Sequence, residues 1–192
     1  MSSTAIQTPP LGGVEPLDKR GIAALLAEAR ERTLALIERV DEQEVDRVHD
    51  PLMSPLAWDL GHIAAFEDLW LGQQAGGLEP LRPELWEVYD ATETPRPARG
   101  DLPYLRAREA RAYMDAVRER SLRVLERADL SDPGDRLNSG GFVWDMVVRH
   151  EHQHNETMIQ TLCLAERGVC TPDRRPLPRT AAAGPVRVRV EA

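Results

Sequence analysis

Four long stretches of the sequence repeat apolar residues at intervals of three and four, and this periodicity constrains the fold more than any other feature. The stretches cover residues 22–40, 56–70, 105–128 and 142–167. Such spacing gives an α-helix a single buried stripe. Strand-like alternation is confined to three valines in 186–190, with no second segment of that kind to pair with. The sequence therefore predicts an all-α fold, an antiparallel four-helix bundle.

Capping residues predict where these helices begin and end. Aspartate and serine side chains cap helix N-termini, proline suits the first helical position, and glycine suits the residue after the last turn. On these rules the predicted starts are at Asp18, Ser54-Pro55, residues 101–103 and Ser139, and the predicted stops of the second and fourth helices are at Gly76-Gly77 and Gly168.

A long proline-rich connection should separate the second and third helices. Residues 78–101 lose the helical periodicity and contain four prolines. Loops of this length inside a compact domain are often functional. Beyond it, the predicted buried face of the third helix comprises Leu105, Ala112, Tyr113, Ala116, Val117, Val124, Leu125 and Ala128.

Length and composition favour one ordinary folded domain. A chain of 192 residues with 42% hydrophobic and 29% charged residues can bury one core. Its net charge of −8 argues against binding to nucleic acid, and it has no apolar run of the ~18 residues that cross a bilayer. Two cysteines and the lack of a signal-peptide pattern favour the cytoplasm. We divide the chain into a flexible N-terminal segment (1–16), the bundle (17–170) and a proline-rich linker or tail (171–192).

Histidines on two of the predicted helices suggest a metal site. His150 and His154 continue the apolar stripe that Val143 and Val147 begin, so both should point into the bundle. Imidazoles four residues apart on a helix can reach one metal ion. His62 lies midway along the second helix, beside apolar residues, and could project towards the fourth helix, which carries His150 and His154. By contrast, His152 should face outward, and His49 lies in a turn without such support.

The alternative is that these are ordinary buried histidines satisfied by hydrogen bonds. Three of them in one interior make that costly, because each buried polar group without a partner costs roughly 1–3 kcal/mol. A metal ion removes the cost by turning the neutral nitrogens into ligands. Three ligands leave coordination positions open, which favours a catalytic over a structural site. Imidazole suits zinc, iron, copper and nickel alike, so the ligands do not select the metal.

Three separated segments carry a resemblance to a known family. They are 54–63 (SPLAWDLGHI), 82–90 (RPELWEVYD) and 150–158 (HEHQHNETM). Together, and in this order, they resemble the N-terminal DinB-like domain of the ergothioneine-pathway sulfoxide synthases, the EgtB-type hercynine oxygenases. The resemblance covers about residues 52–168 and implies a DinB-like bundle.

The resemblance also implies an activity and roles for particular residues. Family members are non-heme iron(II) enzymes that couple O2, a thiol (γ-glutamylcysteine or cysteine) and hercynine into a sulfoxide with a new carbon–sulfur bond. Their iron ligands match His62, His150 and His154. A glutamine that holds hercynine matches Gln153, and arginines that contact the thiol substrate match Arg96 and Arg99. Arginine suits this role because it binds carboxylates in a bidentate manner.

The resemblance ends where the family's second domain would begin. That domain supplies much of the substrate pocket and the tyrosine thought to donate a proton, so no catalytic residue is assigned here. We expect either a truncated or split member, or one that works with a separate C-terminal-domain partner chain. Other readings remain: a DinB-type thiol transferase or isomerase using zinc or nickel, a selenoneine synthase, or a non-catalytic metal-binding subunit.

Two sets of residues near the histidines have simpler interpretations. Trp58, Trp70 and Trp144 are expected to pack in the core in preference to forming a substrate cage. Glu151 and Glu156 could orient imidazoles as hydrogen-bond partners, or could form a solvated helix face.

Overall fold

The structure is a computed structural model that describes residues 18–171. The predictions for segments 1–16 and 172–192, including the alternating valines, lie outside the described residues. Within 18–171 the regular elements are helical, and the single β-bridge joins Val40 to Cys170. The prediction of an all-α fold is confirmed. No helix in this part of the chain is both long enough and apolar enough to cross a lipid bilayer.

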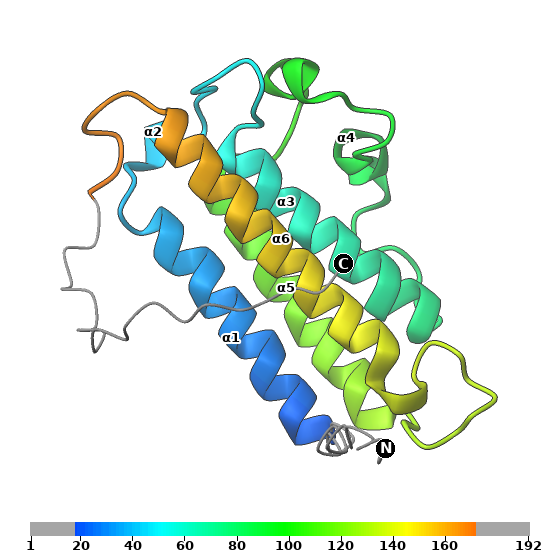
Figure 1. The fold of residues 1–192 in the computed structure, drawn as a ribbon. Helices are drawn as coiled ribbons and strands as arrows, with labels where there is room; N and C mark the ends of the chain where they lie inside the picture. The colour runs from blue at the N-terminus through cyan, green and yellow to red at the C-terminus, as the bar shows by residue number, and fades with distance from the viewer. Residues whose placement is uncertain (1–17, 172–192) are drawn as a thin grey trace, which may run out of the picture.

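Four long helices make up the body of the molecule (Figure 1). They are α1 (Lys19–Ile37), α3 (Leu56–Glu67) with its π-helical continuation η1 (Asp68–Ala75), α5 (Ala107–Arg127) and α6 (Phe142–Leu164). Shorter elements are α2 (Glu42–Val45), η2 (Pro83–Leu85), α4 (Trp86–Tyr89), η3 (Arg96–Asp101) and η4 (Ser139–Gly141). The connection predicted for 78–101 therefore contains three short helical turns.

The directions of the helices differ from simple alternation. Arg30 of α1 contacts Glu151 of α6, and Thr33, three residues further along α1, contacts Asn155, four residues further along α6, so these two helices are parallel. In the same way, Glu67–Arg118 and Asp68–Arg120 show that α3 and η1 run parallel to α5. The long connection causes this arrangement, because it returns the chain to the end at which α3 began (Figure 1). The two parallel pairs are antiparallel to each other.

The first helix follows the sequence prediction closely. The Asp18 carboxylate accepts a hydrogen bond from the Gly21 N–H at 2.7 Å, which satisfies one of the free donors of the first turn. Its buried residues are Ile22, Leu26, Ala29, Arg30, Thr33 and Ile37. All but Arg30 lie on the predicted stripe. The burial of a charged residue, Arg30, on this face was not predicted from the sequence.

The start of α3 corrects a prediction. Pro55 is the N-cap residue, and no side chain caps this end. The Ser54 hydroxyl instead accepts a hydrogen bond from the Arg99 guanidinium at 2.9 Å, so it is unavailable to the helix. The predicted end is confirmed, since η1 finishes at Ala75 and Gly77 adopts a φ of +64°.

The predicted start of the third helix was about five residues too early. The α5 helix begins at Ala107, whose N–H donates to the Asp46 carboxylate at 2.8 Å. Its buried face also differs, because Ala112 and Ala116 are exposed while Ala107, Ala110 and Met114 are buried. The fourth helix, α6, starts after Gly141, which has a φ of +79°, and ends at Leu164, earlier than the predicted stop at Gly168.

Candidate metal centre

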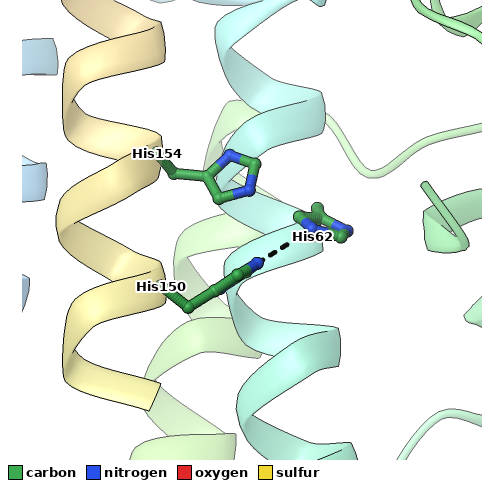
Figure 2. A group of neighbouring side chains, drawn as sticks. All are labelled: His62, His150 and His154. Carbon is green, nitrogen blue, oxygen red and sulfur yellow. Dashed lines mark hydrogen bonds between the residues drawn. The ribbon is translucent and has the colours of Figure 1, made fainter. Parts of the chain in front are cut away.

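The three predicted histidine ligands meet at one point between α3 and α6 (Figure 2). One ring nitrogen from each of His62, His150 and His154 lies within 4.8 Å of the other two. The Nε2 atoms of His62 and His150 are 3.3 Å apart. Two nitrogens bound to one ion at a typical distance are separated by roughly 3.0–3.4 Å, so this pair already has the spacing of two ligands.

Burial keeps His62 and His150 neutral. Burial, and after it the neighbouring His154, lowers the pKa of His62 to about 3. Burial likewise lowers the pKa of His150 to about 2, with contributions from His154 and His62. A cation is poorly tolerated in a dry site beside other potential cations. The lone pairs of these nitrogens are therefore free for a metal at neutral pH.

Hydrogen bonds on the far side of two rings fix which nitrogen faces the site. His62 Nδ1 lies 2.8 Å from the Tyr89 carbonyl oxygen, and His154 Nδ1 lies 3.0 Å from Asp59 Oδ1. A carbonyl and a carboxylate can only accept, so both Nδ1 atoms must donate. Each Nε2 then carries the lone pair. His150 is held differently, since its ring stacks on Phe66 with 3.6 Å between centroids.

Asp59 is the functional candidate that sequence reasoning missed. It is fully buried, and its second oxygen, Oδ2, has no hydrogen-bond partner in the described part of the chain. A carboxylate on the outer nitrogen of a histidine ligand orients the ring and raises its basicity. The available sequence signal for Asp59 was its position three residues before His62. The imidazole that Asp59 binds, that of His154, lies on another helix. Only the packing of α3 against α6 reveals the pair.

The prediction that the tryptophans pack in the core is confirmed. Trp58 and Trp144 are fully buried, and Trp70 is half-buried and packs against the core. Trp58 also supports the site, because its ring stacks on His62 at 4.9 Å and its Nε1 donates to the Val88 carbonyl.

Two cavities open beside the histidines. The first, of about 290 Å³, is lined by His62, His150, Phe66, Leu69, Trp86, Tyr89, Asp90 and neighbouring small residues. The second, of about 500 Å³, is lined by Phe66, Phe142, Asp145, Met146, Arg149, His150 and Gln153. His150 and Phe66 border both cavities. A molecule in either space could therefore approach the point where the three imidazoles meet.

Of the three predicted substrate-binding residues, Gln153 lines one of these cavities and the two arginines lie outside both. Gln153 is exposed and lines the second cavity. Arg96 is exposed, with its guanidinium 3.6 Å from the Met53 sulfur. Arg99 is buried over the Trp58 ring and donates to Ser54 Oγ and to backbone carbonyls of its own loop. Neither arginine lines either of the two cavities.

The remaining candidates lie away from the site. His152 is half-buried beside Glu28 on α1, 3.4 Å from its carboxylate, and His49 contacts the Glu44 carbonyl. Glu156 is exposed, as the solvated-face interpretation requires. Both interpretations of Glu151 are wrong, because it is buried and pairs with arginines of α1 and α5.

Three imidazoles from two helices, two of them with their outer nitrogens fixed by hydrogen bonds, define a helical-bundle protein with a candidate mononuclear metal site. The chain belongs to the DinB superfamily, whose sequence profile matches residues 25–158. This assignment agrees with the family resemblance in the sequence and with the helical fold.

Three curated relatives, each named Hercynine oxygenase, are similar to this chain. The protein from Mycolicibacterium smegmatis is 45% identical over 147 residues, 76% of this chain and 32% of the relative. Those from Mycolicibacterium thermoresistibile and Mycobacterium tuberculosis are 42% and 45% identical over 154 and 145 residues, or 79% and 74% of this chain and 33% and 32% of the relatives. The chain thus spans about a third of the length of the curated relatives it matches.

Proposed function

We propose that this chain is the iron(II)-binding part of a hercynine-type sulfoxide synthase. The proposed reaction couples O2, a thiol (γ-glutamylcysteine or cysteine) and hercynine to give a sulfoxide with a new carbon–sulfur bond, and water. The observation that carries the proposal is the convergence of His62, His150 and His154 beside two cavities. The similarity to proteins named Hercynine oxygenase supports the choice of reaction.

The donor set fits a divalent transition metal. His62 and His154 would each bind through Nε2, because their Nδ1 atoms are engaged by Tyr89 and Asp59. Three nitrogen ligands leave open positions, and iron(II) bound there supplies a site for O2 and a thiolate together with the redox chemistry of oxygen activation. Imidazole alone would also accept zinc or nickel, so the choice of iron rests on the resemblance to the sulfoxide synthase family.

The chain's own residues bind and shield the reactants. Phe66, Leu69 and Trp86 form an apolar wall of the cavity beside His62, which limits the access of water to the reacting atoms. Gln153 offers an amide in the cavity on the other side of His150, where it can hydrogen-bond hercynine. Binding both reactants next to one ion would hold the reacting atoms close together in a suitable orientation, which lowers the entropic part of the activation barrier.

Arg96 and Arg99 are proposed to contact the thiol substrate. γ-Glutamylcysteine carries two carboxylates, which match the fork of a guanidinium. Arg96 is exposed and can reach a ligand directly. Arg99 already donates from Nε and from both terminal nitrogens to groups within the protein. A substrate carboxylate would therefore accept from the N–H groups of Arg99 that these three hydrogen bonds leave available. We expect turnover to need polypeptide beyond residues 18–171, in this chain or in a partner chain.

Anaerobic iron(II) titration of the chain tests the metal site. His150→Ala should abolish stoichiometric binding, while His152→Ala, two residues away, should bind like the parent. Equal losses in both variants would contradict the ligand assignment. Competition with zinc(II) and nickel(II) tests the choice of metal. Mass spectrometry after incubation with hercynine, thiol, O2 and iron(II), with and without a candidate partner chain, tests the reaction through the sulfoxide product.

A further inference from the structure

Four buried charged residues form a closed set of ion pairs in the centre of the bundle. This ionic cluster consists of Arg30, Glu67, Arg118 and Glu151, one residue from each long helix. Arg30 lies 2.9 Å from Glu67 and 2.8 Å from Glu151. Arg118 lies 2.8 Å from Glu67 and 3.1 Å from Glu151. Each arginine thus bridges both carboxylates.

The hydrogen bonding of the ionic cluster is complete on the acceptor side. All four carboxylate oxygens accept a guanidinium N–H. The arginines also reach the backbone, since Arg30 Nη1 donates to the Met114 carbonyl at 3.1 Å and Arg118 Nη1 donates to the Leu26 carbonyl. The two glutamate side chains are at most 1% exposed and the two arginine side chains at most 12%. Because its members come from four helices, this network ties the positions of those helices to one another.

The ionic cluster lies on the same helices as the metal ligands. Glu151 is the neighbour of His150 and precedes His154 by three residues. At about 100° per residue, its side chain leaves α6 on a different face from the imidazoles. Glu67 follows His62 by five residues near the end of α3. Next to His154, Asn155 shares Thr33 with Glu151 as a hydrogen-bond partner. A rotation of α6 that moved its histidines would therefore also break these contacts.

Stability alone does not explain why such a cluster occupies the core. The desolvation of two buried ion pairs can exceed their Coulomb attraction, and well-packed apolar side chains often stabilise a core as well or better. A closed charged network differs from an apolar core because its hydrogen bonds form only when the helices that carry it have particular rotations. In this protein the network includes residues of α3 and α6, so it constrains the rotation of these two helices.

We propose that Arg30, Glu67, Arg118 and Glu151 are positioning residues that fix the rotation of α3 and α6, so that the imidazoles of His62, His150 and His154 meet at one point. The inference rests on the proposed metal site and adds the device that sets its geometry. Its members touch neither the ion nor a substrate. They act through the helices that carry the ligands.

The first test replaces the whole ionic cluster by apolar residues in the full 192-residue chain. The variant Arg30→Met/Glu67→Leu/Arg118→Met/Glu151→Leu should remain helical by circular dichroism and unfold at the same or a higher temperature. Its affinity for cobalt(II), used as a spectroscopic probe, should fall at least tenfold, with a changed visible absorption spectrum. A folded variant with the parent's affinity and spectrum would overturn the proposal.

The second test uses a single conservative change, so that the proposal stays testable if the fourfold variant does not fold. Glu151→Gln keeps the size of the side chain but removes its charge. Measured on the fraction that is folded by circular dichroism, it should bind cobalt(II) at least tenfold more weakly and with an altered spectrum. The matched control is Glu119→Gln, an exposed carboxylate on α5, which should bind like the parent.

The outcomes separate this inference from the proposed metal site. Failure of the parent chain to bind cobalt(II), or undiminished binding by His150→Ala, would refute the metal site itself. Loss of binding in His150→Ala together with parent-like affinity and spectrum in Glu151→Gln would overturn the role of the ionic cluster alone.

Discussion

At the scale of single residues, Asp59 separates this site from a chance meeting of three histidines. Its buried carboxylate binds the outer nitrogen of His154 and leaves Oδ2 without a partner in the described residues. The Arg99 guanidinium interacts electrostatically with this carboxylate. A cation at the proposed metal site, on the other side of the His154 ring, would add to the compensation of its charge.

Replacing this carboxylate should weaken metal binding more than it weakens the fold. In Asp59→Asn the amide oxygen can still accept from His154 Nδ1, but the charge is gone. We expect a loss of roughly 10–100-fold in iron(II) affinity, the usual effect of removing such a partner. Isothermal titration under anaerobic conditions measures it. Asp115→Asn, at an exposed position on α5, should keep the parent's affinity; a similar loss there would point to a general charge effect.

Sequence periodicity could predict the histidines but not their supporting partners. His150 and His154 were assigned to the interior because helical spacing fixes which face they share. Asp59 supports His154 across a gap of 95 residues, and the Tyr89 carbonyl supports His62 across a gap of 27 residues. Such contacts depend on how elements pack. Local pattern carries no information about them.

At the scale of elements, the site depends on how closely the connection approaches α3. Gly61 lies directly under the Tyr89 ring, and a Cβ built there would overlap the phenol carbon and oxygen atoms. The Tyr89 hydroxyl in turn accepts from the Leu105 N–H at 2.9 Å, and its carbonyl accepts from His62. The absence of a side chain at Gly61 thus lets Tyr89 of α4 bind both the segment just before α5 and His62, a proposed metal ligand.

The substitution Gly61→Ala should disturb this contact. The added methyl group must push Tyr89 away, which we expect to lower the free energy of unfolding by about 1–3 kcal/mol, the usual cost of overpacking. Metal affinity should fall as well, because the carbonyl that orients His62 moves with Tyr89. Urea unfolding and iron(II) titration measure the two effects. Gly134→Ala, in an exposed turn, is the control and should leave affinity unchanged. Unaltered affinity in Gly61→Ala would show that the Tyr89 carbonyl is dispensable.

Element boundaries were predictable where the determining contacts are local. Asp18 caps α1 as predicted, because its acceptor and donor lie three residues apart. Ser54 does not cap α3, since Arg99, 45 residues later, engages its hydroxyl. The start of α5 is marked both by a local cap, the Glu109 carboxylate on the Arg106 N–H at 3.2 Å, and by Asp46 from 61 residues away. A long-range partner therefore accounts for the error at Ser54, whereas the local cap at Arg106 was overlooked in the sequence.

At the scale of the whole molecule, the bundle buries two ionisable rings, those of His62 and His150, whose pKa values are lowered mainly by burial. His62 and His150 resist protonation in the folded state, with pKa values lowered to about 3 and about 2. In the unfolded chain both should titrate near the ordinary value of about 6.5. The difference links the stability of the metal-free protein to pH.

Between about pH 3 and 6.5 the unfolded chain therefore binds protons that the folded protein refuses, so acid favours unfolding. We expect the metal-free protein to lose stability as the pH falls below 6.5, by about 1.4 kcal/mol for each of the two rings at pH 5.5. Urea unfolding at pH 7.5 and 5.5 measures the loss. Because other groups also titrate, the parent is compared with two variants. The loss of unfolding free energy between pH 7.5 and 5.5 should be smaller in His62→Phe/His150→Phe by the contribution of both rings. In His152→Ala this loss should equal that of the parent. The same pH dependence in the double variant and the parent would mean that the two rings are not held neutral by the fold.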